Sequence, residues 1–227
     1  SAAYYDCDAW FEAYRKTLRD FQPDVAFTRP FSPGVALEYL DPKFMRWPGH
    51  GVGPNNGLQA IEIESLQDSE YDLFLKDTAE YMIRHHLPRL HGSLGFLAAL
   101  PKLSGMGWIE PWSAQNLALL FTEPDFEAAI ANLQKAGREI RKWRSKVKEF
   151  EQLLAEYGLP TLHQGGMLPP FDIISHSIRG MKGTMLDVYR RPDQLMEACE
   201  MLLEKELERP LPPPNEYGNL RLFMTNT

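Results

Sequence analysis

Residues 161–189, TLHQGGMLPPFDIISHSIRGMKGTMLDVY, predict a strand that leads into a helix. The strand is expected over Thr161–Gln164, before a pair of glycines, and the helix over Ile173–Tyr189. A further helix at Pro192–Leu207 and a strand at Leu220–Thr225 complete the pattern. Strands joined through helices are expected to be parallel, because a parallel pair needs a long crossover connection. This stretch therefore predicts an α/β fold.

The rest of the chain is predicted to continue this alternation. A loop rich in proline and glycine, residues 30–57, separates the first strand from the second. Four strands in 227 residues are too few for a doubly wound sheet, but they fit part of a decorated TIM (β/α)8 barrel of about 250 residues. The other predicted strands are Val25–Thr28 and Leu58–Ile63, and the other predicted helices are Asp8–Leu18, Ser69–Arg84, Gly92–Leu100, Pro111–Phe121 and Glu123–Tyr157.

The two ends of the chain suggest how much of the barrel it contains. The chain starts at Ser1 without an initiator Met and stops at Thr227, directly after a predicted strand. We therefore expect residues 1–227 to be a single domain and a partial barrel, a piece that lacks N-terminal and C-terminal portions of the fold.

The strongest periodicity lies between residues 123 and 157, where apolar residues recur at alternating steps of three and four. Pro124 suits the first turn of this helix, and Gly158 is expected to end it. Seven Lys or Arg between Lys135 and Lys148 indicate a solvated face rather than a nucleic-acid interface. Because a 3.5-residue repeat also suits helix pairing, helix 123–157 is the predicted surface of a homodimer.

Composition excludes several classes of protein. The chain has 24 basic and 31 acidic residues, and the net charge of −7 argues against nucleic acid and anionic membranes as partners. No apolar run is long enough to cross a bilayer. Cys7 and Cys199 are too far apart for a metal or redox motif, and no apolar signal segment begins the chain. The expected compartment is the reducing cytoplasm.

The helix after the third strand carries the main catalytic candidates. Asp172, His176 and Arg179 are spaced by four and three residues, so they would share one helix face. This places an acid, a titratable ring and a cation near a strand end, with Asp172 orienting a catalytic His176 and Arg179 binding substrate. In the structural alternative, Asp172 caps the helix and Arg179 pairs with it on the surface.

Other candidates follow strands or lie in the long loop. Arg29 follows the first strand, where barrel enzymes place site residues, and would bind a substrate carboxylate or phosphate unless it only bonds loop carbonyls. His50, between two glycines, is a candidate general acid or base, with an ordinary turn residue as the alternative. His163 and Gln164 are candidate substrate ligands at the end of the third strand. The following Gly165-Gly166 would offer N–H groups to an anion or simply form a tight turn.

No metal site is predicted within this chain. His85 and His86 are adjacent on a predicted helix and point in different directions, and His91 follows outside any His-Glu-x-x-His pattern. A solvated helix end explains these histidines.

Five stretches together resemble the uroporphyrinogen decarboxylase superfamily. They are WPGHG at 47–51, DSEYDLFLKD at 68–77, LPR at 87–89, PPFDIISHSIRG at 169–180 and MLDVYRRPDQL at 185–195. They occur in the family's order, and the resemblance covers roughly residues 23–227.

The resemblance implies a TIM barrel with its site at the carboxyl ends of the strands. One branch of the superfamily removes acetate carboxyls from a tetrapyrrole without a cofactor. Another uses a zinc thiolate site to move methyl groups between a corrinoid and a thiol or other acceptor. The zinc ligands of that branch would lie beyond Thr227, so zinc and a corrinoid are expected only with a longer protein, and no cofactor within this chain.

Two departures from the family pattern decide between these branches. Arg29 stands where the decarboxylases have an Asp that faces the pyrrole nitrogens, and His176 stands where they have a Tyr. A guanidinium would oppose the protonated pyrrole from which carbon dioxide departs. The predicted function is therefore corrinoid-dependent methyl transfer, with a tetrapyrrole or a corrinoid protein as the partner. A carboxy-lyase of uroporphyrinogen decarboxylase type in porphyrin biosynthesis is the alternative, and a non-catalytic tetrapyrrole-binding or assembly subunit is the second alternative.

Overall fold

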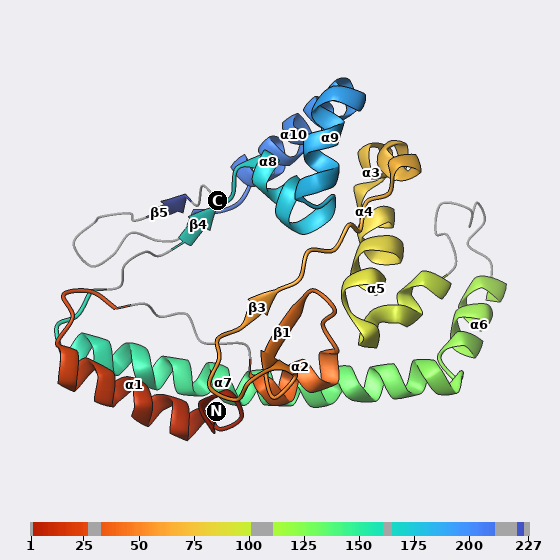
Figure 1. The fold of residues 1–227 in the computed structure, drawn as a ribbon. Helices are drawn as coiled ribbons and strands as arrows, with labels where there is room; N and C mark the ends of the chain where they lie inside the picture. The colour runs from red at the N-terminus through yellow and green to blue at the C-terminus, as the bar shows by residue number, and fades with distance from the viewer. Residues whose placement is uncertain (1, 27–32, 101–110, 161–164, 212–221, 225–227) are drawn as a thin grey trace.

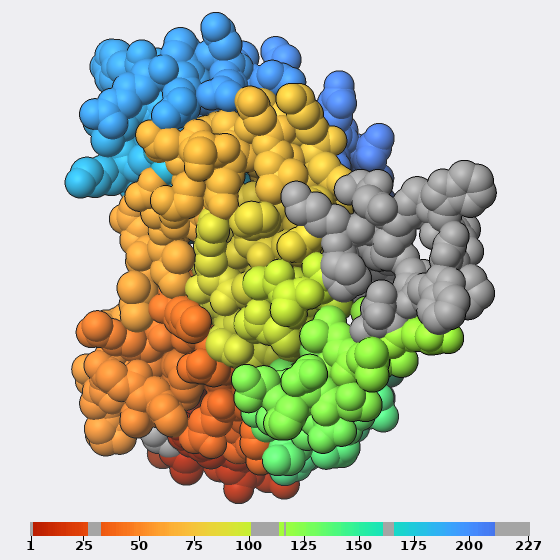
Figure 2. Space-filling model, turned by 90° about the vertical axis from the view of Figure 1, so that its right-hand side faces the viewer, coloured from red at the N-terminus to blue at the C-terminus, as the bar shows by residue number. Residues whose placement is uncertain are grey.

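The computed structural model describes residues 2–26, 33–100, 111–160, 165–211 and 222–224. These residues form a mixed α/β structure that is predominantly helical (Figure 1). The long helix α7 runs along one side of the molecule with α1 beside it, and α8, α9 and α10 gather on the opposite side. In the space-filling view, the segment around residues 60–100 fills the space between these two parts (Figure 2).

The helices and strands have the following bounds. The α-helices are α1 (Cys7–Phe21), α2 (Gly34–Leu40), α3 (Tyr71–Lys76), α4 (Thr78–Tyr81), α5 (Leu87–Leu90), α6 (Pro111–Leu120), α7 (Pro124–Glu156), α8 (Pro170–Ile173), α9 (Met181–Arg190) and α10 (Pro192–Leu207). The 3₁₀ helices are η1 (Ala2–Tyr4), η2 (Asp68–Glu70) and η4 (Gly92–Ala99), and π-helical turns span Met82–His86 and Ile174–Ile178. The strands are β1 (Met45–Pro48), β2 (Gly51–Val52), β3 (Gln59–Ala60), β4 (Gly165–Met167) and β5 (Leu222–Met224). Among the helices described, none combines the length and the apolar character that crossing a membrane requires.

An aromatic cluster joins α1 to α7. Asp6 caps α1 by accepting hydrogen bonds from the N–H groups of its first turn. Trp10 packs against Trp143 and Phe150 at ring-centroid distances of 5.9 and 5.4 Å. The predicted helix at 123–157 is confirmed as α7, but part of its apolar stripe is buried within the chain. The homodimer through this helix stays a prediction, and the buried part of the stripe is not free to form it.

A second core joins the middle of the chain to the C-terminal helices. It contains Tyr71, Phe74 and Tyr81 from α3 and α4, which pack against Ile174, Ile178 and residues of α10. Tyr71, Phe74 and Tyr81 are fully buried, so each contributes a large apolar area to this core. This core positions the Ile174–Ile178 turn, which contains His176 and directly precedes Arg179.

Two small sheets are present among the described residues. One has the strand order β2-β1-β3, and in the other β4 and β5 are parallel, with Gly165 opposite Leu222. The pairing corrects the prediction that Gly165-Gly166 forms a loop, because both glycines belong to β4. The described strands do not close a barrel. Of the first predicted strand, Ala26 donates its N–H to the carbonyl of Pro160 at 3.1 Å, and the residues after it lie outside the described ranges.

Two predicted helices are interrupted, and the predicted loop has structure. The helix expected over Ser69–Arg84 breaks at Asp77, whose side chain caps α4. The helix expected over Ile173–Tyr189 breaks at Gly180. The loop 30–57 contains α2, β1 and β2, and the strand expected over Leu58–Ile63 shortens to β3. Helix 192–207 is confirmed as α10.

Gly180 combines a positive φ with a close approach of another side chain. Its φ of 78° favours glycine, and an added Cβ would lie 2.8 Å from a carboxylate oxygen of Glu62. We expect Gly180→Ala to lower the free energy of unfolding by about 1–3 kcal/mol, measured by urea denaturation. The matched change Gly137→Ala, inside α7 with open space around it, should instead stabilise by about 0.5–1 kcal/mol. Equal effects of the two changes would show that the backbone at Gly180 is unstrained.

Candidate functional site

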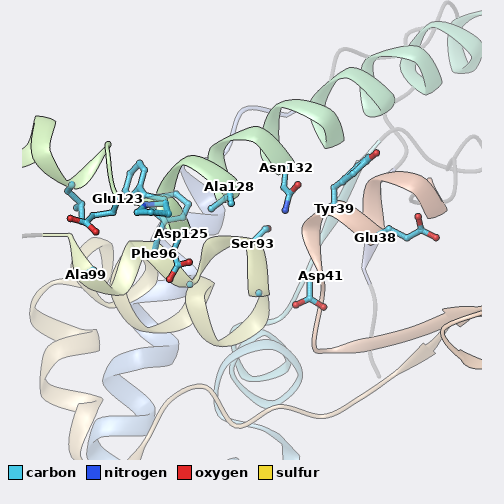
Figure 3. Close-up of a pocket in the computed structure, with 16 residues that line it drawn as sticks. Glu38, Tyr39, Asp41, Ser93, Phe96, Ala99, Glu123, Asp125, Ala128 and Asn132 are labelled. Carbon is cyan, nitrogen blue, oxygen red and sulfur yellow. The ribbon is translucent and has the colours of Figure 1, made fainter.

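A pocket of about 820 Å³ lies between α2, η4 and the start of α7 (Figure 3). Glu38, Tyr39 and Asp41 come from α2 and its C-terminal end, and Ser93 and Phe96 from η4. The first three turns of α7 supply the remaining wall, including Asp125 and Asn132. The pocket forms here because η4 and α2 both pack on α7 and leave a hollow between them.

His50 lies beside this pocket. Its Nε2 is 3.1 Å from Oε1 of Glu38, a pocket residue, and its ring stacks on Trp47 at 4.5 Å between centroids. The predicted acid–base candidate therefore has a carboxylate partner, in a turn anchored by the hydrogen bond from the Tyr5 hydroxyl to the carbonyl of Pro48. A carboxylate bonded to one ring nitrogen fixes the orientation of an imidazole.

Asp172 and His176 occupy the connection that follows β4. Asp172 is half-buried in the first turn of α8, where its backbone carbonyl accepts a hydrogen bond from the hydroxyl of Ser175 at 3.3 Å. His176 is exposed in the π-helical turn. The predicted capping role of Asp172 is wrong, because Pro169 occupies the N-cap position and no side-chain cap bond is made there.

Arg179 has a different position from the one that its spacing predicts. It is buried with an exposed fraction of 4%, whereas His176 is exposed, so the two do not share one face. The π-helical turn is the physical cause. The N–H of Arg179 bonds the carbonyl of Ile174, five residues earlier, and this changes the angular spacing that an α-helix would give.

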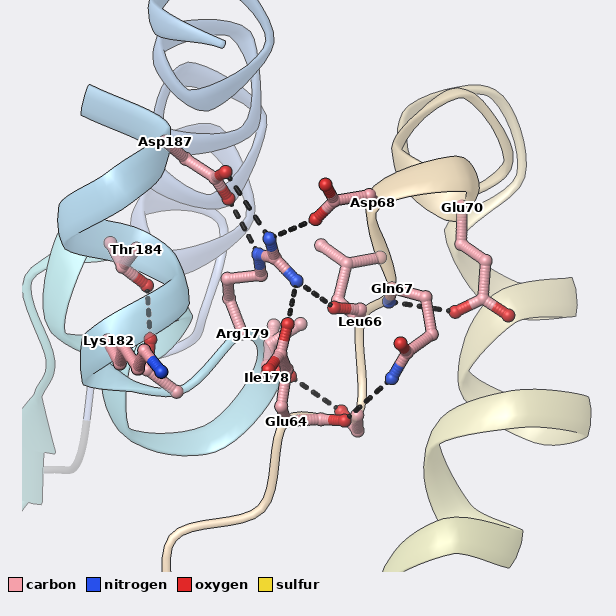
Figure 4. A network of polar contacts seen from close by, with 12 residues as sticks. Glu64, Leu66, Gln67, Asp68, Glu70, Ile178, Arg179, Lys182, Thr184 and Asp187 are labelled. Carbon is pink, nitrogen blue, oxygen red and sulfur yellow. Dashed lines mark hydrogen bonds and ion pairs between the residues drawn. The ribbon is translucent and has the colours of Figure 1, made fainter. Parts of the chain in front are cut away.

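The guanidinium of Arg179 is the centre of a buried network (Figure 4). Its Nε donates to Asp187 Oδ2 at 2.6 Å, and its other N–H groups reach Glu64, the carbonyl of Leu66, Asp68 and the second oxygen of Asp187. A guanidinium has five N–H donors, and all five have an acceptor here. A substrate carboxylate could therefore bind Arg179 only by displacing one of these partners. In place of the surface pair with Asp172, Arg179 pairs with the buried Asp187 and with the half-exposed Glu64 and Asp68.

Charge balance in this network rests on Asp187. Its exposed fraction is 1%, and the hydroxyl of Tyr71 also donates to its Oδ2 at 2.7 Å. Burial opposes the charge on Arg179, but the bonds to Asp187 and the nearby Glu64 and Asp68 outweigh it and raise the pKa of Arg179. Arg191 donates to Asp68 at 2.8 Å, and this hydrogen bond holds the pKa of Asp68 below its ordinary value.

A second buried polar cluster surrounds Ser65. Its Oγ lies 2.7 Å from Nδ1 of His86, 3.2 Å from the hydroxyl of Tyr81 and 2.8 Å from the carbonyl of Ile178. Burial, with smaller contributions from His91 and Arg89, lowers the pKa of His86 to about 4. His86 therefore stays neutral at neutral pH, and the solvated helix end predicted for it is wrong.

Sequence reasoning missed Asp187, Glu64 and the Ser65–His86 pair. One local signal was present, because Asp187 interrupts the apolar residues of a predicted helix eight residues after Arg179. Glu64 gave no such signal, since it lies 115 positions from Arg179. The predicted ligands Arg29, His163 and Gln164 lie outside the described residues.

A metal site finds little support among the described residues. Within the part of the chain that the structure describes, Asp6, Cys7 and Asp8 are the one group that brings three possible ligand atoms close together. Asp6 caps α1, Cys7 is buried in the aromatic core and Asp8 pairs with Lys146 at 2.9 Å, so each already has a structural role. These residues do not fit the zinc thiolate site that the family resemblance implies for a longer protein.

Comparison with family models, curated proteins and solved structures finds no significant match for this chain.

Proposed function

We propose that the chain is part of a barrel enzyme of the uroporphyrinogen decarboxylase superfamily that transfers a methyl group from a corrinoid. The observation that supports this proposal is the parallel pair β4–β5, joined through α8, α9 and α10. Such a helical crossover between neighbouring parallel strands is the repeating unit of a TIM barrel. Asp172 and His176 follow the carboxyl end of β4, the end at which barrel enzymes place their site residues.

The cations of the described network favour methyl transfer over decarboxylation. A tetrapyrrole with several acetate groups needs cations that are free to pair with its carboxylates. Arg179 has all of its N–H groups bonded, Arg191 pairs with Asp68, and Arg89 pairs with both oxygens of Glu70. The sequence gives a separate reason against decarboxylation, because Arg29 stands where the decarboxylases have an Asp that faces the pyrrole nitrogens.

His176 is the residue that we expect to act on the methyl acceptor. An exposed imidazole can take the proton of a thiol while the sulfur forms its bond to the methyl carbon, and the bond from that carbon to the corrinoid would break with both electrons left on the corrinoid. Asp172, one helical turn earlier, would limit the orientations of that ring. No step is assigned to zinc, because the described residues do not fit it.

The test follows the absorbance of methylcobalamin mixed with the protein and a small thiol at pH 7. We expect a protein-dependent loss of the methylcobalamin spectrum, slowed about 100-fold in His176→Gln, in line with the usual contribution of a general base. His85→Gln is the matched control, because His85 pairs with Glu70 away from β4 and should leave the rate unchanged.

A parallel incubation with uroporphyrinogen separates the alternatives. Carbon dioxide release without demethylation would overturn methyl transfer in favour of the carboxy-lyase. Binding of either compound without turnover would favour the non-catalytic subunit, and no binding of either would overturn the superfamily assignment.

A further inference from the structure

The pocket between α2, η4 and α7 is independent of the residues used in the proposed function. Its volume of about 820 Å³ falls in the range of small-molecule sites. Its walls come from elements held by packing on α7, and the ring of Phe96 packs at a tilt against that of Phe126, 4.4 Å between centroids, to form part of the wall. It therefore combines a concave shape with a fixed apolar surface.

Carboxylates lie at both ends of this pocket. Glu123 and Asp125 are on one side, and Glu38 and Asp41 are on the other, as Figure 3 shows. Among the described residues that line the pocket, none is Lys, Arg or His. A ligand that bridged both ends would therefore have to carry positive charge at each of them.

The middle of the pocket has a different character. Phe96, Ala128, Ser93 and Asn132 lie between the two acidic ends. Phe96 and Ala128 suit a methylene chain, and the hydroxyl and amide suit a single amine within it. Asp125 and Asn132 are seven residues apart on α7, about 10 Å along the helix axis, and Figure 3 shows Glu38 and Asp41 on the far side of Asn132 from Asp125. The charges of a ligand would therefore be separated by an extended chain.

A cation already lies against one wall of this region. The ammonium group of Lys135 is 5.4 Å from the centroid of the Tyr39 ring, and Tyr39 lines the pocket. Lys135 does not itself line the pocket, but its contact shows that the ring of Tyr39 binds an ammonium group.

We propose that the pocket binds a linear polyamine, with an ammonium group at each acidic end and the methylene chain across Phe96 and Ala128. The ends determine the charge of the ligand, and the distance between them determines its length. A monoamine can satisfy only one end, and an anion is repelled by both.

The experiment is calorimetric titration of the full chain with spermidine as the probe. We expect saturable binding with one site, weakened by added NaCl, and at least tenfold weaker binding of a monoamine of equal chain length. The double variant Glu123→Gln/Asp125→Asn should weaken spermidine binding about tenfold. Glu38→Gln tests the opposite end and should weaken binding in the same direction.

Glu127→Gln is the matched control. Glu127 lies in the same first turn of α7 and has the same charge, but it does not line the pocket. Glu123, Asp125 and Glu127 all lie at the N-terminus of α7, where a negative charge stabilises the helix. The control therefore separates the loss of a ligand contact from a change in helix stability. Equal weakening by Glu127→Gln, or equal affinity for the monoamine, would overturn the proposal. If the double variant does not fold, as judged by its circular dichroism, Glu38→Gln and the monoamine comparison decide.

Discussion

Replacement of Arg179 by methionine is expected to lower the free energy of unfolding by about 3–5 kcal/mol, the usual cost of removing one partner of a buried ion pair. The change leaves Asp187 buried with an exposed fraction of 1% and without its closest cation, so that Arg191, whose Nε is 3.9 Å from Oδ1, is the cation left near it. It also removes the donor to the carbonyl of Leu66. Glu64 and Asp68 are about half exposed, so solvent would compensate for most of their loss. Urea denaturation at pH 7 measures the effect.

Arg191→Met is the matched control for this prediction. Arg191 pairs with Asp68 at 2.8 Å and also lies 3.9 Å from Asp187, but its side chain is nearer the surface, so its replacement should destabilise the protein clearly less than that of Arg179. The double variant Arg179→Met/Asp187→Leu should be more stable than Arg179→Met alone, because no uncompensated charge then remains in the core. If Arg179→Met and Arg191→Met prove equally mild, the buried network does not hold the C-terminal helices in place.

The long helices were predictable because local patterns determine them. In α7 the apolar period, Pro124 in the first turn and Gly158 after the last turn all agree, and in α10 Pro192 marks the start. The strands were less predictable because each has two to four residues and depends on a distant partner. β4 pairs with β5, which lies more than 50 positions later, so the glycines of β4 gave no strand signal of their own.

The site was predicted in part, and the limit has a definite physical cause. Spacing indicated that Asp172, His176 and Arg179 belong to one local segment, and the structure places them in α8 and the turn that follows it. The shared face was derived from α-helical geometry, and the π-helical turn changes that geometry. The partners of Arg179 come from residues 64–68, and a contact across more than 100 positions leaves no periodic trace in a single sequence.

Acidification from pH 6.5 to 4.5 is expected to lower the free energy of unfolding by about 2–3 kcal/mol through His86 alone. The pKa of His86 is about 4 in the folded protein and about 6.5 in the unfolded chain, so the unfolded chain takes up the proton first as the pH falls. Stability therefore falls as the pH falls through this window, by about 1 kcal/mol per pH unit. Urea denaturation at half-unit intervals measures the slope.

The range from pH 6.5 to 4.5 separates the contribution of His86 to stability from that of the carboxylates. The hydrogen bond from Arg89 lowers the pKa of Glu70 to about 2, so the stability that Glu70 contributes is lost mainly below its ordinary pKa of 4.5. His86→Gln should remove most of the slope between pH 6.5 and 4.5, whereas His85→Gln, at a more exposed ring, should keep it. A slope that survives in His86→Gln would assign the acid sensitivity to another group. Ser65 contacts both His86 and the carbonyl of Ile178, and Arg179 donates to the carbonyl of the next residue, Leu66. If the slope is lost in His86→Gln, protonation of His86 weakens the same contact between residues 65–66 and residues 178–179 that Arg179 stabilises.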